Sequence, residues 1–328
     1  MILFIWSELS SSVTGIWILA HPGSLYEGTR KGSHIKNKSV ISNVSQLRII
    51  MASKLLVFGG NGFLGRRICQ QAVKCGWEVV SMSRSGKPPA LASSRDRQWI
   101  QKVKWEAADI LNPSTYQKHF KGAAGVVHSL GILLEDESYK KQLRQEVGPS
   151  KSTSYSWASW LPSFGPNPLI KKDPNFTYET MNKQSAIILA RAFAESIDPS
   201  ETARKDMPTF TYISADKGFP LIPEGYITSK RQAEEELMRY TDVFRPILVR
   251  PGFLFDETKT TIDPRTYIHN ALELLNCGNK ALLGNKFECV NNLIRPTVST
   301  QQVSRCVLAK IEDPRFEGIV SLEVIKKA

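Results

Sequence analysis

A glycine-rich turn near the start of the chain constrains its fold more than any other feature. The apolar run Leu55–Phe58 leads directly into Gly59–Gly65 (GGNGFLG), and a helical pattern follows with Leu64, Ile68 and Ala72 on one face. Glycine is needed where a chain turns this sharply and lets a phosphate approach its backbone and the helix N-terminus. The turn therefore predicts the phosphate cradle of a dinucleotide site, with a turn that binds nothing as the alternative. The cradle would consist of Gly59, Asn61, Gly62, Phe63, Leu64 and Gly65.

Strand and helix patterns alternate along the rest of the chain. Strands are expected at residues 54–58, 78–83, 103–107, 125–129, 209–214 and 246–250, and helices at 63–75, 177–196 and 226–239. Such alternation is typical of a parallel sheet with helices on both faces. We therefore expect a Rossmann-type, doubly wound α/β domain over residues 51–328, with a small C-terminal substrate-pocket region from about residue 252.

Two segments fall outside this pattern. Residues 28–50 are basic, rich in serine and free of acids, as in a mitochondrial presequence. Met51 directly precedes the first strand, so the alternative is that translation starts there and residues 1–50 do not belong to the protein. Residues 135–175 form a long insert that contains Trp157 and Trp160. We expect it to contact a partner or a membrane, or to cover the substrate pocket.

The chain is basic, with a formal net charge of +12, of which residues 51–328 carry +9. A basic surface favours anionic partners such as phosphorylated cofactors, lipid surfaces or nucleic acid; the alternative is a basic isoelectric point typical of matrix proteins, without a specific partner. The sequence has neither a dense Lys/Arg run nor an aromatic–basic stacking motif, so we expect no nucleic-acid partner. Its five cysteines are scattered without a CxxC pair, which predicts reduced thiols and no metal site.

The end of the second predicted strand indicates which dinucleotide is bound. An NAD site would place an acid about 20 residues beyond the glycines, to bind the ribose 2′-hydroxyl. This chain has Arg84 there, between Ser83 and Ser85, and no acid from Val79 to Arg95. A guanidinium suits a 2′-phosphate through charge-assisted hydrogen bonds. The sequence therefore favours NADP(H) over NAD(H), with a solvated arginine as the alternative.

Tyr226 and Lys230 are four residues apart, so they share one face of the predicted helix. A neighbouring cation stabilises a phenolate and thereby lowers the pKa of a tyrosine, which makes it a better proton donor and acceptor at neutral pH. Ser214 follows the fifth predicted strand, where its hydroxyl could hold a substrate carbonyl. These residues predict a proton-transfer site; an ordinary exposed helix face is the alternative.

With these residues the chain resembles the extended and atypical short-chain dehydrogenases/reductases, the NAD(P)-dependent epimerase/dehydratase group. The resemblance extends to Asp109 (ADI), residues 126–131 (VVHSLG), Asn182 and Pro251 (RPG). It implies that Asp109 contacts adenine and that Pro251 lies at the cofactor, with the substrate pocket formed by the segment after it. It also implies that Asn182 lies beside the catalytic set. The cofactor would be lined by Ser129, Leu130 and Gly131.

Residues 54–65, 128–134, 212–223 and 293–303 resemble more closely a group of fungal mitochondrial proteins of this type that act in coenzyme Q (ubiquinone) biosynthesis. That group is related to the Rossmann-type accessory subunit of respiratory complex I. The resemblance implies a mitochondrial matrix location at the periphery of the inner membrane, a multi-protein coenzyme Q complex and a quinone-related substrate. Two functions remain open: an NADP(H)-dependent oxidoreductase, which the Ser–Tyr–Lys set favours, and a non-catalytic nucleotide-binding assembly or regulatory subunit.

Overall fold

The chain divides into two units, Met1–Met51 and Ala52–Ala328. The computed structural model describes residues 2–5, 16–21, 24–29, 38–39, 53–89, 94–132, 175–198, 207–216, 223–258, 270 and 296–328. The described part of the first unit is an antiparallel sheet of β1 (Ile2–Ile5), β2 (Ile16–His21), β3 (Ser24–Thr29) and β4 (Lys38–Ser39). The sequence pattern did not predict these strands. Most of the insert at 135–175 lies outside the described residues.

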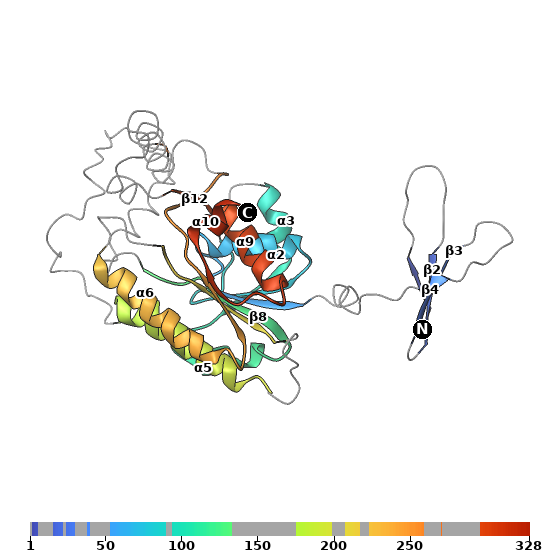
Figure 1. The fold of residues 1–328 in the computed structure, drawn as a ribbon, viewed down its shortest axis with the longest axis horizontal. Coiled ribbons are helices and arrows are strands. Elements are labelled where there is room, and N and C mark those ends of the chain that lie inside the picture. Colours follow the sequence, from blue (N-terminus) through green and yellow to red (C-terminus); the bar gives the residue numbers. More distant parts are fainter. Residues whose placement is uncertain are drawn as a thin grey trace. The chain divides into compact units, whose positions relative to one another are not determined.

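A seven-stranded parallel sheet forms the centre of the second unit (Figure 1), in the order β13-β10-β9-β8-β5-β6-β7. The strands are β5 (Lys54–Phe58), β6 (Glu78–Ser83), β7 (Val103–Ala107), β8 (Ala123–His128), β9 (Thr209–Ile213), β10 (Arg245–Val249) and β13 (Gly318–Val320). A separate parallel pair is formed by β11 (Leu254–Phe255) and β12 (Val298–Ser299). From β5 the chain adds β6 and β7 on one side of the sheet, and then returns to add β8, β9, β10 and β13 on the other side. In doubly wound sheets a dinucleotide binds where the direction of strand addition reverses in this way, here between β5 and β8. The predicted Rossmann-type fold is confirmed.

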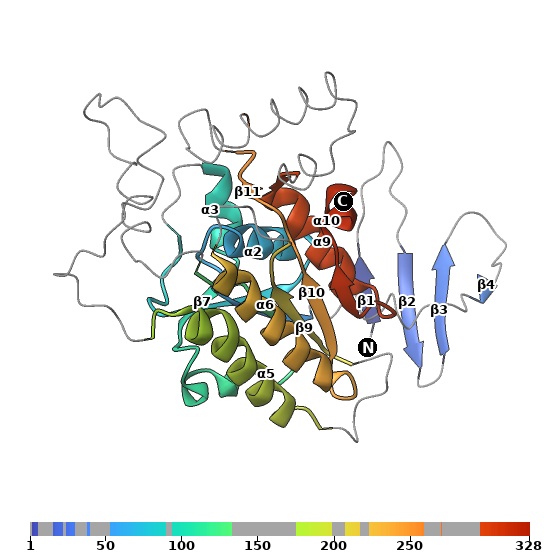
Figure 2. The ribbon, with the colours of Figure 1, turned by 60° about the vertical axis from the view of Figure 1, so that its left-hand side comes forward.

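Helices cover both faces of this sheet (Figures 1 and 2). One face carries α2 (Gly65–Lys74), α3 (Ser94–Ile100), α9 (Thr300–Glu312) and α10 (Leu322–Lys326). The other carries α5 (Ser185–Glu195), α6 (Glu224–Leu237) and the π-helix Glu179–Gln184 that precedes α5. Short 3-10 turns lie at Pro113–Thr115, Gln117–His119 and Met238–Tyr240.

The core has two layers because successive residues of a strand point to opposite faces of the sheet. On β5, Leu55 and Val57 pack into the layer under α2 and α9, whereas Leu56 and Phe58 pack into the layer under α5 and α6. All four side chains are buried. A central parallel strand is covered on both faces, which explains why its sequence is a continuous apolar run rather than an alternation.

The structure differs from the sequence-based expectation at several element ends. The helix predicted over 63–75 begins at Gly65, because the backbone is still turning at Gly62. The predicted helix over 177–196 opens with π-helical hydrogen bonding, and the strand predicted to Ser214 ends at Ile213. Six helices and strands of the second unit were not predicted: α3, β11, β12, α9, β13 and α10. Within the described residues, no helix is long and apolar enough to cross a membrane.

Candidate dinucleotide-binding site

The glycine turn forms a tight cradle between β5 and α2. Gly59 adopts a φ of +85°, and its N–H donates to the carbonyl of Met82 at 2.8 Å. A Cβ placed on Gly65 would lie 2.2 Å from the carbonyl oxygen of Gly59, so a larger residue there would push the turn apart. Glycine is therefore required at Gly59 by its conformation and at Gly65 by close packing of the turn on the helix.

The open side of the cradle fits a pyrophosphate. Gly62 is exposed, and a Cβ there would approach only the carbonyl oxygen of Gly59, at 3.0 Å. Among the described residues no side chain caps the N-terminus of α2, and its first turn contains no acid. An anion bound here would interact favourably with the helix dipole and accept hydrogen bonds from the backbone. The turn thus offers the space and the charge that the phosphates of a dinucleotide need.

The turn after β6 fits the adenosine end of such a ligand. The Asn61 amide nitrogen lies 3.2 Å from the Ser83 hydroxyl and 3.4 Å from the Ser85 hydroxyl, which ties this turn to the cradle. Arg84 and Lys87 are exposed beside these serines. The exposed Asp109 lies close by, because the N–H of its neighbour Ala108 donates to the carbonyl of Ser83 at 2.9 Å. The turn after β6 therefore carries two exposed cations and two hydroxyls next to the cradle.

The segment after β8 links the cradle to the residues expected to transfer protons. A Cβ placed on Gly59 would lie 2.8 Å from Leu130 Cδ2 and 3.0 Å from the carbonyl oxygen of Ser129. One placed on Gly131 would lie 3.0 Å from Asn182 Oδ1 and 3.1 Å from Lys230 Nζ. The chain therefore passes from the phosphate cradle to Asn182 and Lys230 within three residues.

Asn182 is fully buried and fixes the chain just beyond Gly131. Its Oδ1 accepts from the Ile132 N–H at 2.9 Å, its Nδ2 donates to the Ile132 carbonyl at 3.2 Å, and Nδ2 lies 3.4 Å from the Ser229 hydroxyl. The backbone carbonyl of Asn182 accepts from the Tyr212 hydroxyl. The residue lies within the π-helix Glu179–Gln184. Short π-helical turns of this kind occur frequently at functional sites. In this structure Asn182 positions other residues of the site.

Lys230 is a buried ammonium at the centre of the site. Its Nζ donates to the carbonyl of Ile213 at 2.8 Å and lies 4.7 Å from the centre of the Tyr212 ring. Burial lowers the pKa of Lys230 to about 7, and the charge of Glu234 opposes that effect. Burial, followed by the charge of Lys230, lowers the pKa of the buried His128 to about 3, so this imidazole is neutral at physiological pH. Its Nε2 lies 2.9 Å from the Ser185 hydroxyl.

The remaining expected site residues lie around Lys230. Ser214 directly follows Ile213, and its buried hydroxyl accepts a hydrogen bond from Arg231 at 3.2 Å. Tyr226 lies in the first turn of α6, one helical turn before Lys230, with its ring edge-on to Tyr178. The carbonyl of Pro251 accepts from the Asp216 N–H at 2.8 Å, which places the RPG segment beside the end of β9.

Replacing Lys230 with methionine separates a structural from a functional role. A buried ammonium is costly, so we expect Lys230→Met to be at least as stable as the wild type at pH 6 and to bind NADPH about tenfold more weakly. The unfolded chain binds more protons than the folded one between the folded pKa of about 7 and the unfolded value of 10.5, so wild-type stability rises across that range. The advantage of the variant should shrink accordingly. Melting curves at pH 6, 8 and 10 and a binding titration measure both effects; a variant that is unstable at pH 6 would contradict this prediction.

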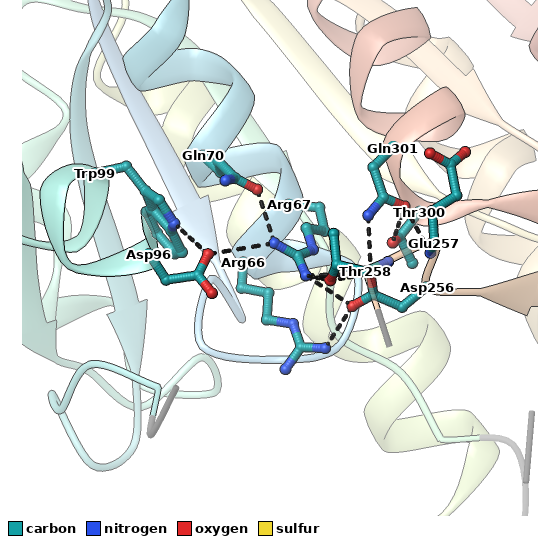
Figure 3. Close-up of polar contacts among 10 residues, drawn as sticks. All are labelled: Arg66, Arg67, Gln70, Asp96, Trp99, Asp256, Glu257, Thr258, Thr300 and Gln301. Atoms are coloured by element: carbon teal, nitrogen blue, oxygen red, sulfur yellow. Dashed lines mark hydrogen bonds and ion pairs between the residues drawn. The ribbon is translucent and has the colours of Figure 1, made fainter. Parts of the chain in front are cut away.

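Sequence reasoning missed a polar cluster beside the cradle (Figure 3), which consists of Arg66, Arg67, Gln70, Asp96, Thr258, Asp256 and Gln301. Arg66 and Arg67 occupy the first turn of α2, where positive charge opposes the helix dipole. Asp256 is an acid that directly follows the apolar residues Phe253–Phe255 after the RPG segment. Each is a weak signal on its own, and the sequence does not show that these residues meet.

Comparison with known proteins agrees with this fold. The model of the NAD dependent epimerase/dehydratase family matches residues 55–143, which contain the cradle and β5 to β8. A short-chain type dehydrogenase/reductase from Mycobacterium ulcerans has a TM-score of 0.49 at 13% identity, and the match covers 83% of this chain and 90% of that one. The parallel sheet and the family match over residues 55–143 agree on a Rossmann-type α/β fold.

The chain also matches two curated relatives over most of its length. It is 59% identical to MIOREX complex component 2 of Saccharomyces cerevisiae over 283 residues, which is 85% of this chain and 100% of that protein. It is 24% identical to the uncharacterized chloroplastic protein At1g32220 of Arabidopsis thaliana, over 85% of this chain and 78% of that protein. The chain belongs to the family of MIOREX complex component 2. The match to the epimerase/dehydratase family implies a nicotinamide dinucleotide cofactor.

Proposed function

We propose that this protein binds NADP(H) and is an oxidoreductase that acts on a small carbonyl or quinone-related substrate. The observation that supports this best is the position of Gly131. The segment that leads to it packs against Gly59 of the cradle through Ser129 and Leu130. A Cβ built on Gly131 itself would lie 3.0 Å from Asn182 Oδ1 and 3.1 Å from Lys230 Nζ. A dinucleotide held in the cradle would extend along this segment toward α6, which carries Tyr226. The preference for NADP(H) over NAD(H) rests on Arg84 and Lys87, which are exposed beside the Ser83 and Ser85 hydroxyls.

The residues around Lys230 would perform the proton chemistry. When bound, the nicotinamide supplies or accepts a hydride at the substrate carbon. Tyr226 would give its proton to the substrate oxygen during reduction, and Ser214 would hold that oxygen by a hydrogen bond. The Lys230 ammonium would stabilise the phenolate left on Tyr226 and bind the nicotinamide ribose. Asn182 would hold the chain at Ile132 and the hydroxyl of Ser229, the neighbour of Lys230, in fixed positions.

The second function is a non-catalytic subunit that binds the nucleotide without turnover. The name of the 59% identical yeast relative, a component of a complex, supports membership of a multi-protein assembly. We further propose a mitochondrial matrix location, a link to coenzyme Q biosynthesis and contact with the periphery of the inner membrane. The basic, acid-free stretch 28–50 and the resemblance in residues 54–65 support the location and the coenzyme Q link. The insert at 135–175 is the segment proposed for the membrane contact.

Cofactor preference is tested directly by reversing the charge at Arg84. We expect Arg84→Asp to bind NADPH about ten- to a hundredfold more weakly than the wild type, because a charge-assisted contact to the 2′-phosphate is lost and a repulsive charge is added. Affinity for NADH, which lacks this phosphate, should change by less than about threefold. Fluorescence titration of both dinucleotides on the full chain measures this.

Arg97→Asp is the matched control, since it makes the same charge change on an exposed residue of the last turn of α3. We expect it to leave the ratio of the two affinities unchanged. A wild-type protein with equal affinity for NADPH and NADH would contradict the proposed role of Arg84.

A further inference from the structure

The two arginines of the first turn of α2 differ in how firmly they are held (Figure 3). Arg67 lies in the middle of the polar cluster, where it contacts Asp256, Asp96, Gln70 and Thr258, and its side chain is 4% exposed. Arg66 lies at the margin of the cluster and its side chain is 13% exposed. Its Nη2 donates to Asp256 Oδ2 at 2.8 Å. Among the described residues, no partner is recorded for its Nη1, and Figure 3 shows this nitrogen directed away from Asp256.

Asp256 does not depend on Arg66 for its own hydrogen bonds. Its buried carboxylate also accepts from Arg67 at 3.0 Å, from Gln301 Nε2 at 2.8 Å, and from the backbone N–H and the hydroxyl of Thr258 at 3.1 and 2.9 Å. These donors already satisfy both carboxylate oxygens. What the contact does is hold the Arg66 side chain in one direction at the start of α2.

The Arg66 guanidinium lies beside Phe63, one of the residues of the phosphate cradle. Arg66 is the residue after the last glycine, its N–H donates to the carbonyl of Gly62 at 3.2 Å, and its guanidinium lies 5.5 Å from the centre of the Phe63 ring. Two guanidinium groups in a first turn without an acid add to the positive end of the helix dipole. A bound anion would relieve this repulsion, and a guanidinium is well suited to a phosphate.

We propose that Arg66 is a further dinucleotide-binding residue, which contacts the pyrophosphate through its free edge while Asp256 acts as the residue that positions it. Arg67, one residue further, is the structural partner of Asp256 and makes no contact with the ligand. This inference rests on the proposed binding of NADP(H). It concerns the part of the ligand that NADPH and NADH share, and this distinguishes it from the role of Arg84.

Binding of both dinucleotides to the full-length Arg66→Met variant tests the inference. We expect affinity for NADPH and for NADH to fall by the same factor, about ten- to a hundredfold, so that the preference between them is unchanged. Arg66→Lys keeps the charge but replaces the planar guanidinium, which can donate two parallel hydrogen bonds, with a single ammonium. This variant should therefore recover part of the lost affinity. Without nucleotide, Arg66→Met should melt within a few degrees of the wild type, because Asp256 keeps its other donors. Lys74→Met, which removes a charge from the last turn of the same helix, is the matched control and should bind like the wild type.

The outcomes separate the two proposals. An Arg66→Met protein that binds both dinucleotides within twofold of the wild type would overturn the role of Arg66 and leave the proposed function standing. A loss confined to NADPH would also overturn it, since that result belongs to the 2′-phosphate. A wild-type chain that binds neither dinucleotide would overturn the proposed function and this inference with it.

Discussion

We expect Asp256→Asn to lower the free energy of unfolding by about 3–5 kcal/mol, because it removes the carboxylate that compensates a buried guanidinium. The Asp256 side chain is fully buried and the Arg67 side chain is 4% exposed. Without Asp256, the one carboxylate left to Arg67 among the described residues would be that of Asp96, at 3.5 Å. The cluster also joins α2 to the segment after β11 and to Gln301 of α9, so we expect the loss to affect the whole sheet unit. A thermal melt should show a midpoint about 10 °C lower.

Asp96→Asn is the matched control for this variant, since it removes a carboxylate from the other side of Arg67. Asp96 is partly exposed and accepts from Arg67 at 3.5 Å and from Trp99 Nε1 at 2.9 Å. An asparagine oxygen can still accept the Trp99 bond, so we expect a loss of about 1 kcal/mol or less. Equal losses in the two variants would contradict the central role assigned to Asp256.

The pH dependence of the Asp256 effect has a defined sign. Burial would raise the pKa of Asp256, but hydrogen bonds from Gln301, Thr258 and Arg67 and the charge of Arg67 outweigh it, so the pKa lies well below its usual range. A group whose pKa is depressed on folding stabilises the protein above its unfolded value of about 4, and that stabilisation is lost as the pH falls below it. The difference between wild type and Asp256→Asn should therefore be constant above about pH 5 and shrink toward pH 2.

The features that the sequence predicted correctly are local ones. The strand β5 is a run of apolar residues that ends at a glycine, and both signals lie within a dozen residues of one another. The order of strands and helices likewise follows from periodicity, since α/β domains obey a few topological rules. By contrast, β13 was missed because it has three residues, one of them glycine and another the exposed Ile319. So short an edge strand is held by its neighbour β10 rather than by its own pattern.

The cluster around Asp256 was missed because its members are far apart in the chain. Arg67 and Asp256 are 189 residues apart, and Gln301 is another 45 residues on. Nothing in the local sequence says that these three polar groups share one buried site. The π-helical turn at Asn182 was missed for a related reason, because its geometry is fixed by tertiary bonds to Ile132 and Tyr212 rather than by residue preference. Sequence patterns predict elements well, but partners distant in the chain require the folded structure.

The largest expected effect on function belongs to Tyr226→Phe, which removes one hydroxyl and keeps the ring. If the protein is an enzyme, loss of this proton donor should slow hydride transfer from NADPH about 10²–10⁴-fold. The fold and the dinucleotide affinity should be retained, because the ring can still pack edge-on to Tyr178 and α6 is unchanged. Stopped-flow oxidation of bound NADPH with quinone-related carbonyl compounds measures the rate, and a binding titration measures the affinity.

The same variant separates an enzyme from a non-catalytic subunit in cells that lack the protein. If the proposed link to coenzyme Q biosynthesis holds, an enzyme with Tyr226→Phe would be present at normal abundance and would fail to restore coenzyme Q content. A subunit that only binds the nucleotide would restore it fully with Tyr226→Phe, yet fail with Gly62→Trp, whose side chain would fill the open side of the cradle. Tyr240→Phe, which removes a hydroxyl just beyond the end of the same helix, controls for the loss of a phenol as such. Full restoration by Tyr226→Phe would show that no proton from this residue is needed, and the bound dinucleotide would then act as a structural or sensing element.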